Sequence, residues 1–152
     1  MVKVQKGKEY YNIPDDLLYA PSIGNIGHIW ARLEKDKARI GITDYGQKQL
    51  KEIVFVELPG PGITVEMLKF DGDKPNTQSI GTIESQKTSI ELFSPLSGTI
   101  FEINEEIENF PGVINQDPYD DGWILIIKPS NLETEKRQLW SAEKYAQELQ
   151  DL

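Results

Sequence analysis

A lysine in the middle of a short polar connection is the residue of this chain best placed to do chemistry. Lys87 lies between two β-like runs, Ile80–Glu84 and Ile90–Phe93, which predict two short strands joined by a tight turn. An amine at a hairpin tip is open to solvent, can be acylated to a stable amide, and would let an attached group swing between separate active sites. The geometry would suit a modified carrier lysine, although a turn lysine taken by itself is more often an ordinary solvated charge.

The other side chains offer little chemistry of their own. The chain has no cysteine, which excludes a disulfide framework, a thiol nucleophile and a thiolate-bound metal. The single histidine, His28, argues against a histidine-based metal site. We expect no metal and no catalytic residue, because no nucleophile and base are paired and redox work would need a cofactor. The chain is therefore predicted to be a substrate of other enzymes and not an enzyme itself.

Composition places the chain among soluble globular proteins of about one domain. It has 152 residues and a net charge of −9, which disfavours binding to nucleic acid and is also what plain solubility requires. No apolar run is long enough to span a membrane, and the N-terminus lacks the apolar segment of a secretory signal. We expect a cytoplasmic protein that binds neither nucleic acid nor membrane.

Short strands separated by turn residues dominate the chain. We expect strands at His28–Leu33, Ala38–Ile42, Ile53–Leu58, Gly98–Asn104 and Trp123–Lys128, in addition to the two that flank Lys87. Short helices are expected from Thr43 or Asp44 to Leu50, at Glu105–Glu108, and after the N-cap Ser141. Residues 1–22 are a polar lead-in, and residues 23–152 are predicted to be a mainly β, sandwich-like or barrel-like domain with a C-terminal helix.

Several sequence blocks, in a fixed order, resemble those of the glycine cleavage system H-proteins, a family of lipoyl carriers. The blocks are ESQKT at residues 84–88, PLSG at 95–98, HIW at 28–30, GITDYGQ at 41–47, IVFVELP at 53–59 and NQDPYDDGW at 115–123. The similarity extends over about residues 12–150.

The resemblance implies a fold, a cofactor and a site. The family's fold is a barrel-sandwich hybrid (the lipoyl/biotinyl-domain type) with added helices, and lipoic acid would be attached covalently to Lys87. The attaching enzyme favours an acidic residue three positions before the lysine and a glycine eleven after it, which here are Glu84 and Gly98. His28 would line the cleft that shelters the loaded arm; the alternative is a partly buried, hydrogen-bonded histidine beside Trp30.

The resemblance also implies partners. A pyridoxal-phosphate glycine decarboxylase would place the aminomethyl group of glycine on the carrier, an aminomethyltransferase would remove it, and a dihydrolipoyl dehydrogenase would reoxidise the arm. A lipoate-attaching enzyme would modify the chain beforehand. The carrier itself is expected to be monomeric.

Some positions depart from the family pattern and leave other functions open. Ile29 stands where an acidic residue is usual, Gln86 where a small apolar residue is usual, and Asp120 where glycine is common, and the loop 68–79 is longer. One alternative is an H-protein-like lipoate carrier that serves heterodisulfide-reductase-like complexes in sulfur oxidation. The other is an unmodified interaction or lipoate-relay protein on the same scaffold.

Overall fold

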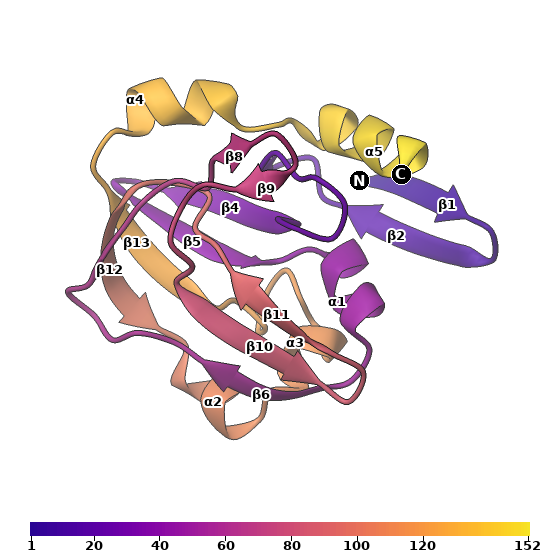
Figure 1. Cartoon of the computed structure of the whole chain (residues 1–152), viewed down its shortest axis with the longest axis horizontal. Coiled ribbons are helices and arrows are strands. Elements are labelled where there is room, and N and C mark those ends of the chain that lie inside the picture. The colour runs from indigo at the N-terminus through magenta and orange to yellow at the C-terminus, as the bar shows by residue number, and fades with distance from the viewer.

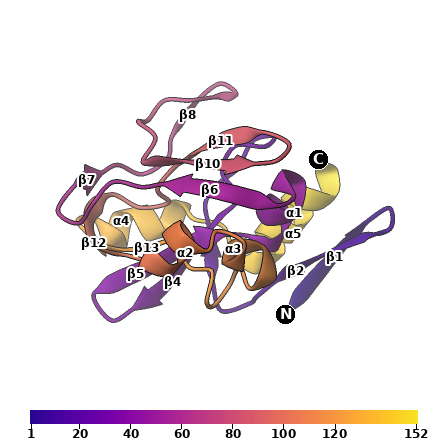
Figure 2. The same cartoon turned by 90° about the horizontal axis from the view of Figure 1, so that it is seen from below.

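Two β-sheets packed face to face form the body of the protein. The computed structural model describes residues 1–152. The larger sheet has the strand order β3-β4-β5-β13-β12-β7, and the smaller has the order β11-β10-β6. Figure 2 shows the two sheets edge-on as separate layers, with the smaller sheet above the larger one. All pairings within both sheets are antiparallel.

Most strands lie close to their predicted positions. The larger sheet consists of β3 (Leu18–Tyr19), β4 (Ile29–Glu34), β5 (Lys37–Ile42), β7 (Thr64–Val65), β12 (Gly98–Ile103) and β13 (Leu125–Pro129). The smaller sheet consists of β6 (Ile53–Glu57), β10 (Gly81–Ser85) and β11 (Ser89–Leu92). The loop at residues 68–79 contains a small hairpin of β8 (Phe70–Asp71) and β9 (Lys74–Pro75).

The main core lies between the two layers. Alternate side chains of each strand point inward, so Ile40 and Ile100 of the larger sheet face Ile83 and Leu92 of the smaller one, and each of the four is at most 1% exposed. The strand predicted at residues 123–128 is buried through Leu125–Ile127. The two sheets do not close into a barrel, and the fold is mainly β with short helices, as the strand pattern predicts, and is consistent with the barrel-sandwich hybrid that the resemblance implies.

The helices are short, and α1, α2 and α5 are capped by side chains. They are α1 (Asp44–Leu50), α2 (Glu105–Asn109), α3 (Val113–Gln116), α4 (Leu132–Glu135) and α5 (Ala142–Asp151), with a 3₁₀ turn at Lys136–Gln138. The hydroxyl of Thr43 accepts a hydrogen bond from Gly46 N–H, so Thr43 is the cap of the two that the sequence allowed. The hydroxyl of Ser141 accepts one from Lys144 N–H, which confirms the predicted cap of α5.

Residues 1–22 are more ordered than a polar lead-in suggests. They form the hairpin of β1 (Val2–Lys6) and β2 (Glu9–Ile13), followed by β3, and Figure 1 shows this hairpin beside α5 and the C-terminus. Here Tyr19 stacks on Tyr145 of α5, with 4.7 Å between ring centroids. The strands in this segment differ from the polar lead-in that its composition predicts. The division of the chain at residue 22 stays a prediction.

Candidate functional site

Lys87 lies at the tip of the β10–β11 hairpin, as predicted, and its amine is free. The strands pair up to Glu84 and Ser89, and Ser85 N–H donates to the carbonyl of Thr88 at 2.8 Å to close the turn. The hydroxyl of Ser85 accepts from the backbone N–H groups of Lys87 and Thr88 at 3.2 and 3.1 Å. The turn is thus held by backbone and serine contacts, while the Lys87 side chain is exposed and makes no hydrogen bond or ion pair.

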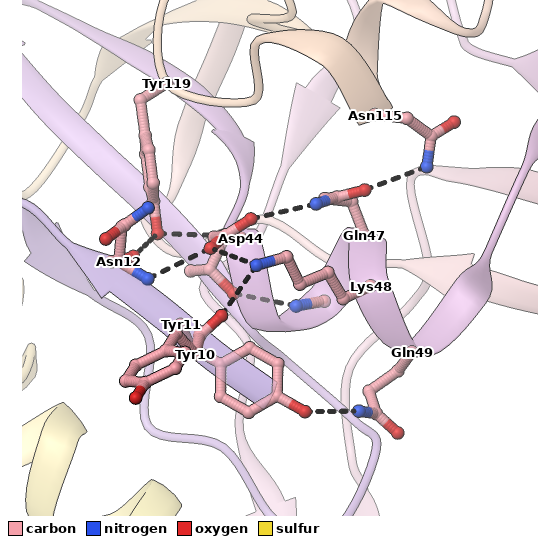
Figure 3. Close-up of polar contacts among 11 residues, drawn as sticks. Tyr10, Tyr11, Asn12, Asp44, Gln47, Lys48, Gln49, Asn115 and Tyr119 are labelled. Atoms are coloured by element: carbon pink, nitrogen blue, oxygen red, sulfur yellow. Dashed lines mark hydrogen bonds and ion pairs between the residues drawn. The ribbon is translucent and has the colours of Figure 1, made fainter. Parts of the chain in front are cut away.

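The tip is fastened to the rest of the domain through the start of β6. Gln86 N–H donates to the carbonyl of Glu52 at 3.1 Å, and Ile53 N–H donates to Asn115 Oδ1 at 2.9 Å. Asn115 Nδ2 donates in turn to Gln47 Oε1 at 2.9 Å, a contact drawn in Figure 3. A chain of hydrogen bonds therefore links the hairpin tip to α3 and α1.

Figure 3 shows that this chain continues to the N-terminal hairpin through Asp44. One carboxylate oxygen of Asp44 accepts from Asn12 N–H at 2.9 Å and lies 3.3 Å from Lys48 Nζ, and the other accepts from Gln47 Nε2 at 2.8 Å. The Tyr119 hydroxyl accepts from Asp44 N–H and donates to the carbonyl of Asn12. Burial raises the pKa of Tyr119, so this hydroxyl stays protonated. These motif residues therefore act as a scaffold, a role that their spacing alone did not reveal.

A pocket of about 190 Å³ opens beside the hairpin tip, on the side that faces α1. Its walls come from the loop at residues 25–28, from Tyr45 and Leu50 of α1, and from Lys87 and Ile90 of the hairpin. The volume equals that of about six water molecules, which is room for a small ring. A larger open groove of about 950 Å³, between residues 57–66 and 76–82, contains neither Lys87 nor His28.

His28 both lines this pocket and is buried by a hydrogen-bonded cluster. Its side chain is 4% exposed, Nε2 lies 2.7 Å from the carbonyl of Gly24, and Nδ1 lies 2.8 Å from the hydroxyl of Tyr145. Because a carbonyl can only accept, Nε2 carries the proton and Nδ1 accepts from Tyr145. Thr43 Oγ completes the cluster, 2.7 Å from the same hydroxyl. His28 is therefore a buried, hydrogen-bonded histidine that also lines the pocket. Contact between His28 and a lipoyl arm stays a prediction.

Burial also fixes the charge of His28. The loss of solvent lowers the pKa of its imidazole to about 4, and the hydrogen bond to Gly24 opposes this only in part. The ring is therefore neutral at neutral pH. Its backbone adopts a φ of 57°, in the left-handed region.

The two predicted recognition residues occupy different environments. Glu84 is exposed on β10, three residues before Lys87. Gly98 is buried in β12 of the other sheet, where it pairs with Val65 and Pro129 and where an added Cβ would collide with the carbonyl of Lys128. Gly98 therefore has a clear packing reason to be glycine, and a part in recognition stays a prediction.

The departures from the family pattern lie mostly away from the pocket. Ile29 is 2% exposed, belongs to the main core and does not line the pocket. Asp120 is exposed and lies 3.7 Å from Arg32. Gln86 is exposed at the hairpin tip itself.

A β-sandwich that presents a free lysine on a hairpin tip beside a pocket is compatible with a carrier for a covalently attached group. The glycine cleavage H-protein family matches residues 24–152, and the chain belongs to this family. A glycine cleavage system H protein of Oceanobacillus iheyensis is 43% identical over 140 residues, which cover 92% of this chain and 99% of the relative. That of Bacillus subtilis is 38% identical over 140 residues, 92% of this chain and 98% of the relative.

A solved structure agrees with the sequence relatives. The crystal structure of a glycine cleavage system H protein from Mycobacterium marinum superposes with a TM-score of 0.74 at 31% identity, over 90% of this chain and 98% of that chain. The chain is thus a lipoyl carrier of the glycine cleavage system, which works with the other components of that system. These matches favour glycine cleavage over the sulfur-oxidation and lipoate-relay alternatives. None of the helices is both long and apolar enough to cross a membrane.

Proposed function

We propose that Lys87 is the lipoyl attachment site and that the chain carries the aminomethyl group of glycine on that arm. The observation that supports this most strongly is the free amine at the tip of a short, well-fastened hairpin. A modifying enzyme can reach it without unfolding any element, since only exposed residues surround it in the turn.

The attachment step needs an activated lipoyl donor such as an acyl-adenylate. The Lys87 nitrogen attacks the carbonyl carbon, an amide bond forms, the bond to the adenylate breaks, and the amine releases a proton. This protein holds the backbone of the turn in place while the Lys87 side chain enters the active site of the attaching enzyme. The Ser85 contacts and the bond from Gln86 to Glu52 supply that rigidity.

Glu84 and Gly98 support the same step in different ways. The exposed carboxylate of Glu84 offers a charge to a basic site on the attaching enzyme. Gly98 acts through packing, because it lets β12 and β13 approach closely. These strands belong to the larger sheet, against which the sheet of the Lys87 hairpin packs.

The pocket beside the tip is the proposed shelter for the arm. When bound, the lipoyl group would supply a dithiol–disulfide couple that this chain cannot offer, since it has no cysteine. The chain's own residues would exclude water: Tyr45, Leu50 and Ile90 provide apolar wall, and neutral His28 keeps its ring bonded to Tyr145 and Gly24.

We infer that the chain performs no catalysis of its own. Its only histidine has both ring nitrogens occupied by hydrogen bonds. The partners would be a pyridoxal-phosphate glycine decarboxylase, an aminomethyltransferase, a dihydrolipoyl dehydrogenase and a lipoate-attaching enzyme. The proposal places a monomeric carrier in the cytoplasm, together with these enzymes.

Mass spectrometry tests the attachment site. Treatment of the unmodified protein with a lipoate ligase, lipoate and ATP should add one lipoyl group, and peptide mapping should locate it on Lys87. Lys87→Ala should remain unmodified with a free energy of unfolding within about 0.5 kcal/mol of wild type, because the side chain has no folded partner. Lys74→Ala, at the exposed β8–β9 hairpin, is the matched control and should be modified normally. An adduct elsewhere, or modification of Lys87→Ala, would overturn the assignment.

A further inference from the structure

The edge strand of the smaller sheet exposes two neighbouring apolar side chains. Val54 and Phe55 of β6 are 47% and 46% exposed. Their position follows from an irregularity in the pairing with β10: Ser85 pairs with Ile53 but Glu84 pairs with Phe55, so that Val54 is an extra residue in β6. A β-bulge of this kind redirects side chains. It explains why two successive residues of one strand are both open to solvent.

Carboxylates surround this apolar pair on the outer face of the sheet. Because Val56 and Ile83 point into the core, their strand neighbours Glu57 and Glu84 point outward, and Glu91 of β11 pairs with the outward Thr82. The three strands contain no lysine or arginine, and none of these three glutamates forms an ion pair anywhere in residues 1–152. In Figure 2 no helix covers this outer side. The face is thus apolar at one edge and negative across its width.

The same face is continuous with the attachment lysine. Glu84 lies three residues before Lys87, a separation of at most roughly 10 Å, and Phe55 is the cross-strand neighbour of Glu84. A protein–protein interface of ordinary size covers about 800 Å² on each partner, a patch roughly 16 Å in radius. An enzyme that draws the Lys87 side chain into its active site must touch the hairpin at its tip. The inner side of the tip borders the pocket and α1, so the outer face is the open approach.

We propose that the outer face of the smaller sheet is the docking surface for the lipoate-attaching enzyme, with Phe55 and Val54 as its apolar anchor. The complementary surface of that enzyme is an apolar depression with lysine or arginine at its rim, matching Glu57, Glu84 and Glu91. Burial of the aromatic ring gives affinity, and the carboxylates give orientation and association rate. This inference rests on the proposed role of Lys87 and adds strand β6 to the surface that the attaching enzyme recognises.

Steady-state lipoylation tests the anchor, with a lipoate ligase, lipoate and ATP acting on the unmodified protein. Phe55→Ala should lower kcat/KM for the carrier about 10-fold or more, mainly through KM, as loss of an interface anchor does. The control is Phe101→Ala: Phe101 is 53% exposed on β12 of the other sheet, and it should react like wild type. Val54→Thr keeps the shape and β propensity but removes apolar surface, so it should show a smaller loss even if Phe55→Ala is poorly folded. The thermal unfolding midpoint of each variant is measured as well, to check that the variant is folded under the assay conditions.

The rim charges give a second readout. Added NaCl should lower kcat/KM for wild type, and the double variant Glu57→Gln/Glu91→Gln should show a weaker salt dependence. If wild type is lipoylated at Lys87 while folded Phe55→Ala and Val54→Thr react at the wild-type rate, the docking surface is refuted and the attachment site stands. If wild type is not modified at Lys87, the attachment site itself fails. If the anchor variants are lipoylated normally and only glycine-dependent turnover slows, the face serves a different enzyme and the proposal is wrong.

Discussion

The hairpin tip around Lys87 and the buried cluster around His28 border the same pocket but are built in opposite ways. Lys87 is exposed, and its amine has no partner. His28, Thr43 and Tyr145 are each at most 4% exposed, and every polar atom of their side chains is hydrogen-bonded. On one side of the pocket the Lys87 amine has no contact to break before it reacts. On the other side, hydrogen bonds hold the side chains of the His28 cluster in place.

This difference shows how a small carrier separates function from stability. A side chain without contacts contributes almost nothing to the free energy of unfolding, so Lys87, the proposed attachment site, can be modified or replaced without disturbing the fold. A buried polar cluster is costly to disturb, because a lost partner leaves a donor or acceptor without water. Substitutions in the cluster should therefore change stability and spare modification, while those at the tip should do the reverse.

Acid should lower the free energy of unfolding through the buried cluster around His28, and this is the largest effect that we expect. The pKa of His28 is about 4 in the fold and 6.5 when unperturbed, so between these values the unfolded chain binds more protons than the folded one. The stabilising contribution is present above pH 6.5 and is lost as the pH falls toward 4, by up to about 3 kcal/mol. Urea unfolding at several pH values measures it. The Tyr145 hydroxyl stays protonated throughout, because burial raises its pKa.

The matched variant for this prediction is His28→Asn, since asparagine tolerates the left-handed backbone at this position. It should be less stable than wild type at pH 7 and should lose the pH-dependent step. If wild type and His28→Asn show the same slope between pH 6.5 and 4, the carboxylates elsewhere control acid stability and the comparison is wrong on this point.

Tyr145→Phe should give the next largest effect, a loss of about 1–3 kcal/mol in the free energy of unfolding. The change keeps the ring that stacks on Tyr19 but leaves His28 Nδ1 without its donor and Thr43 without its acceptor. Thermal melts should show it as a lower midpoint, whereas lipoylation below the midpoint should proceed as in wild type. Tyr10→Phe, at a tyrosine that is 52% exposed, is the control and should be silent. A Tyr145→Phe protein as stable as wild type would mean that water replaces the hydroxyl.

Glu84→Lys should show the reverse pattern, at the smallest expected magnitude. It places a positive charge three residues before Lys87, so lipoylation should slow by about 10-fold, equivalent to about 1.4 kcal/mol, through weaker docking. The melting temperature should hardly change, because Glu84 is exposed and unpaired. Glu102→Lys makes the same change on β12 of the other sheet and should be modified normally. If Glu84→Lys and Glu102→Lys are modified at the same rate, the attaching enzyme does not recognise Glu84.

The sequence predicted local structure well wherever a short pattern determines it. The cap at Thr43, the cap at Ser141 and the buried face of α5 with Ala142, Tyr145 and Leu149 all follow from residue type and helical spacing. The hairpin around Lys87 follows from two β-like runs and a polar turn.

Features that depend on distant contacts could not be predicted in this way. The N-terminal hairpin is an exception, because the alternation of Val2 and Val4 with polar residues and the turn glycine Gly7 are a local strand signal that the description of residues 1–22 as a polar lead-in passes over. The bulge that exposes Val54 and Phe55 depends on the register between β6 and β10. Burial of Gly98 against the carbonyl of Lys128 is likewise a contact between strands, which a single sequence cannot display.

The most direct test of the account is glycine–bicarbonate exchange with the glycine decarboxylase of the same organism, measured with the lipoylated protein. The account predicts that lipoylated wild type supports exchange, that the unmodified protein and ligase-treated Lys87→Ala do not, and that added salt slows the reaction if the acidic surface assists docking. Exchange with Lys87→Ala would contradict the assignment of the arm. No exchange with protein whose lipoylation at Lys87 has been verified would contradict glycine cleavage and favour the sulfur-oxidation carrier.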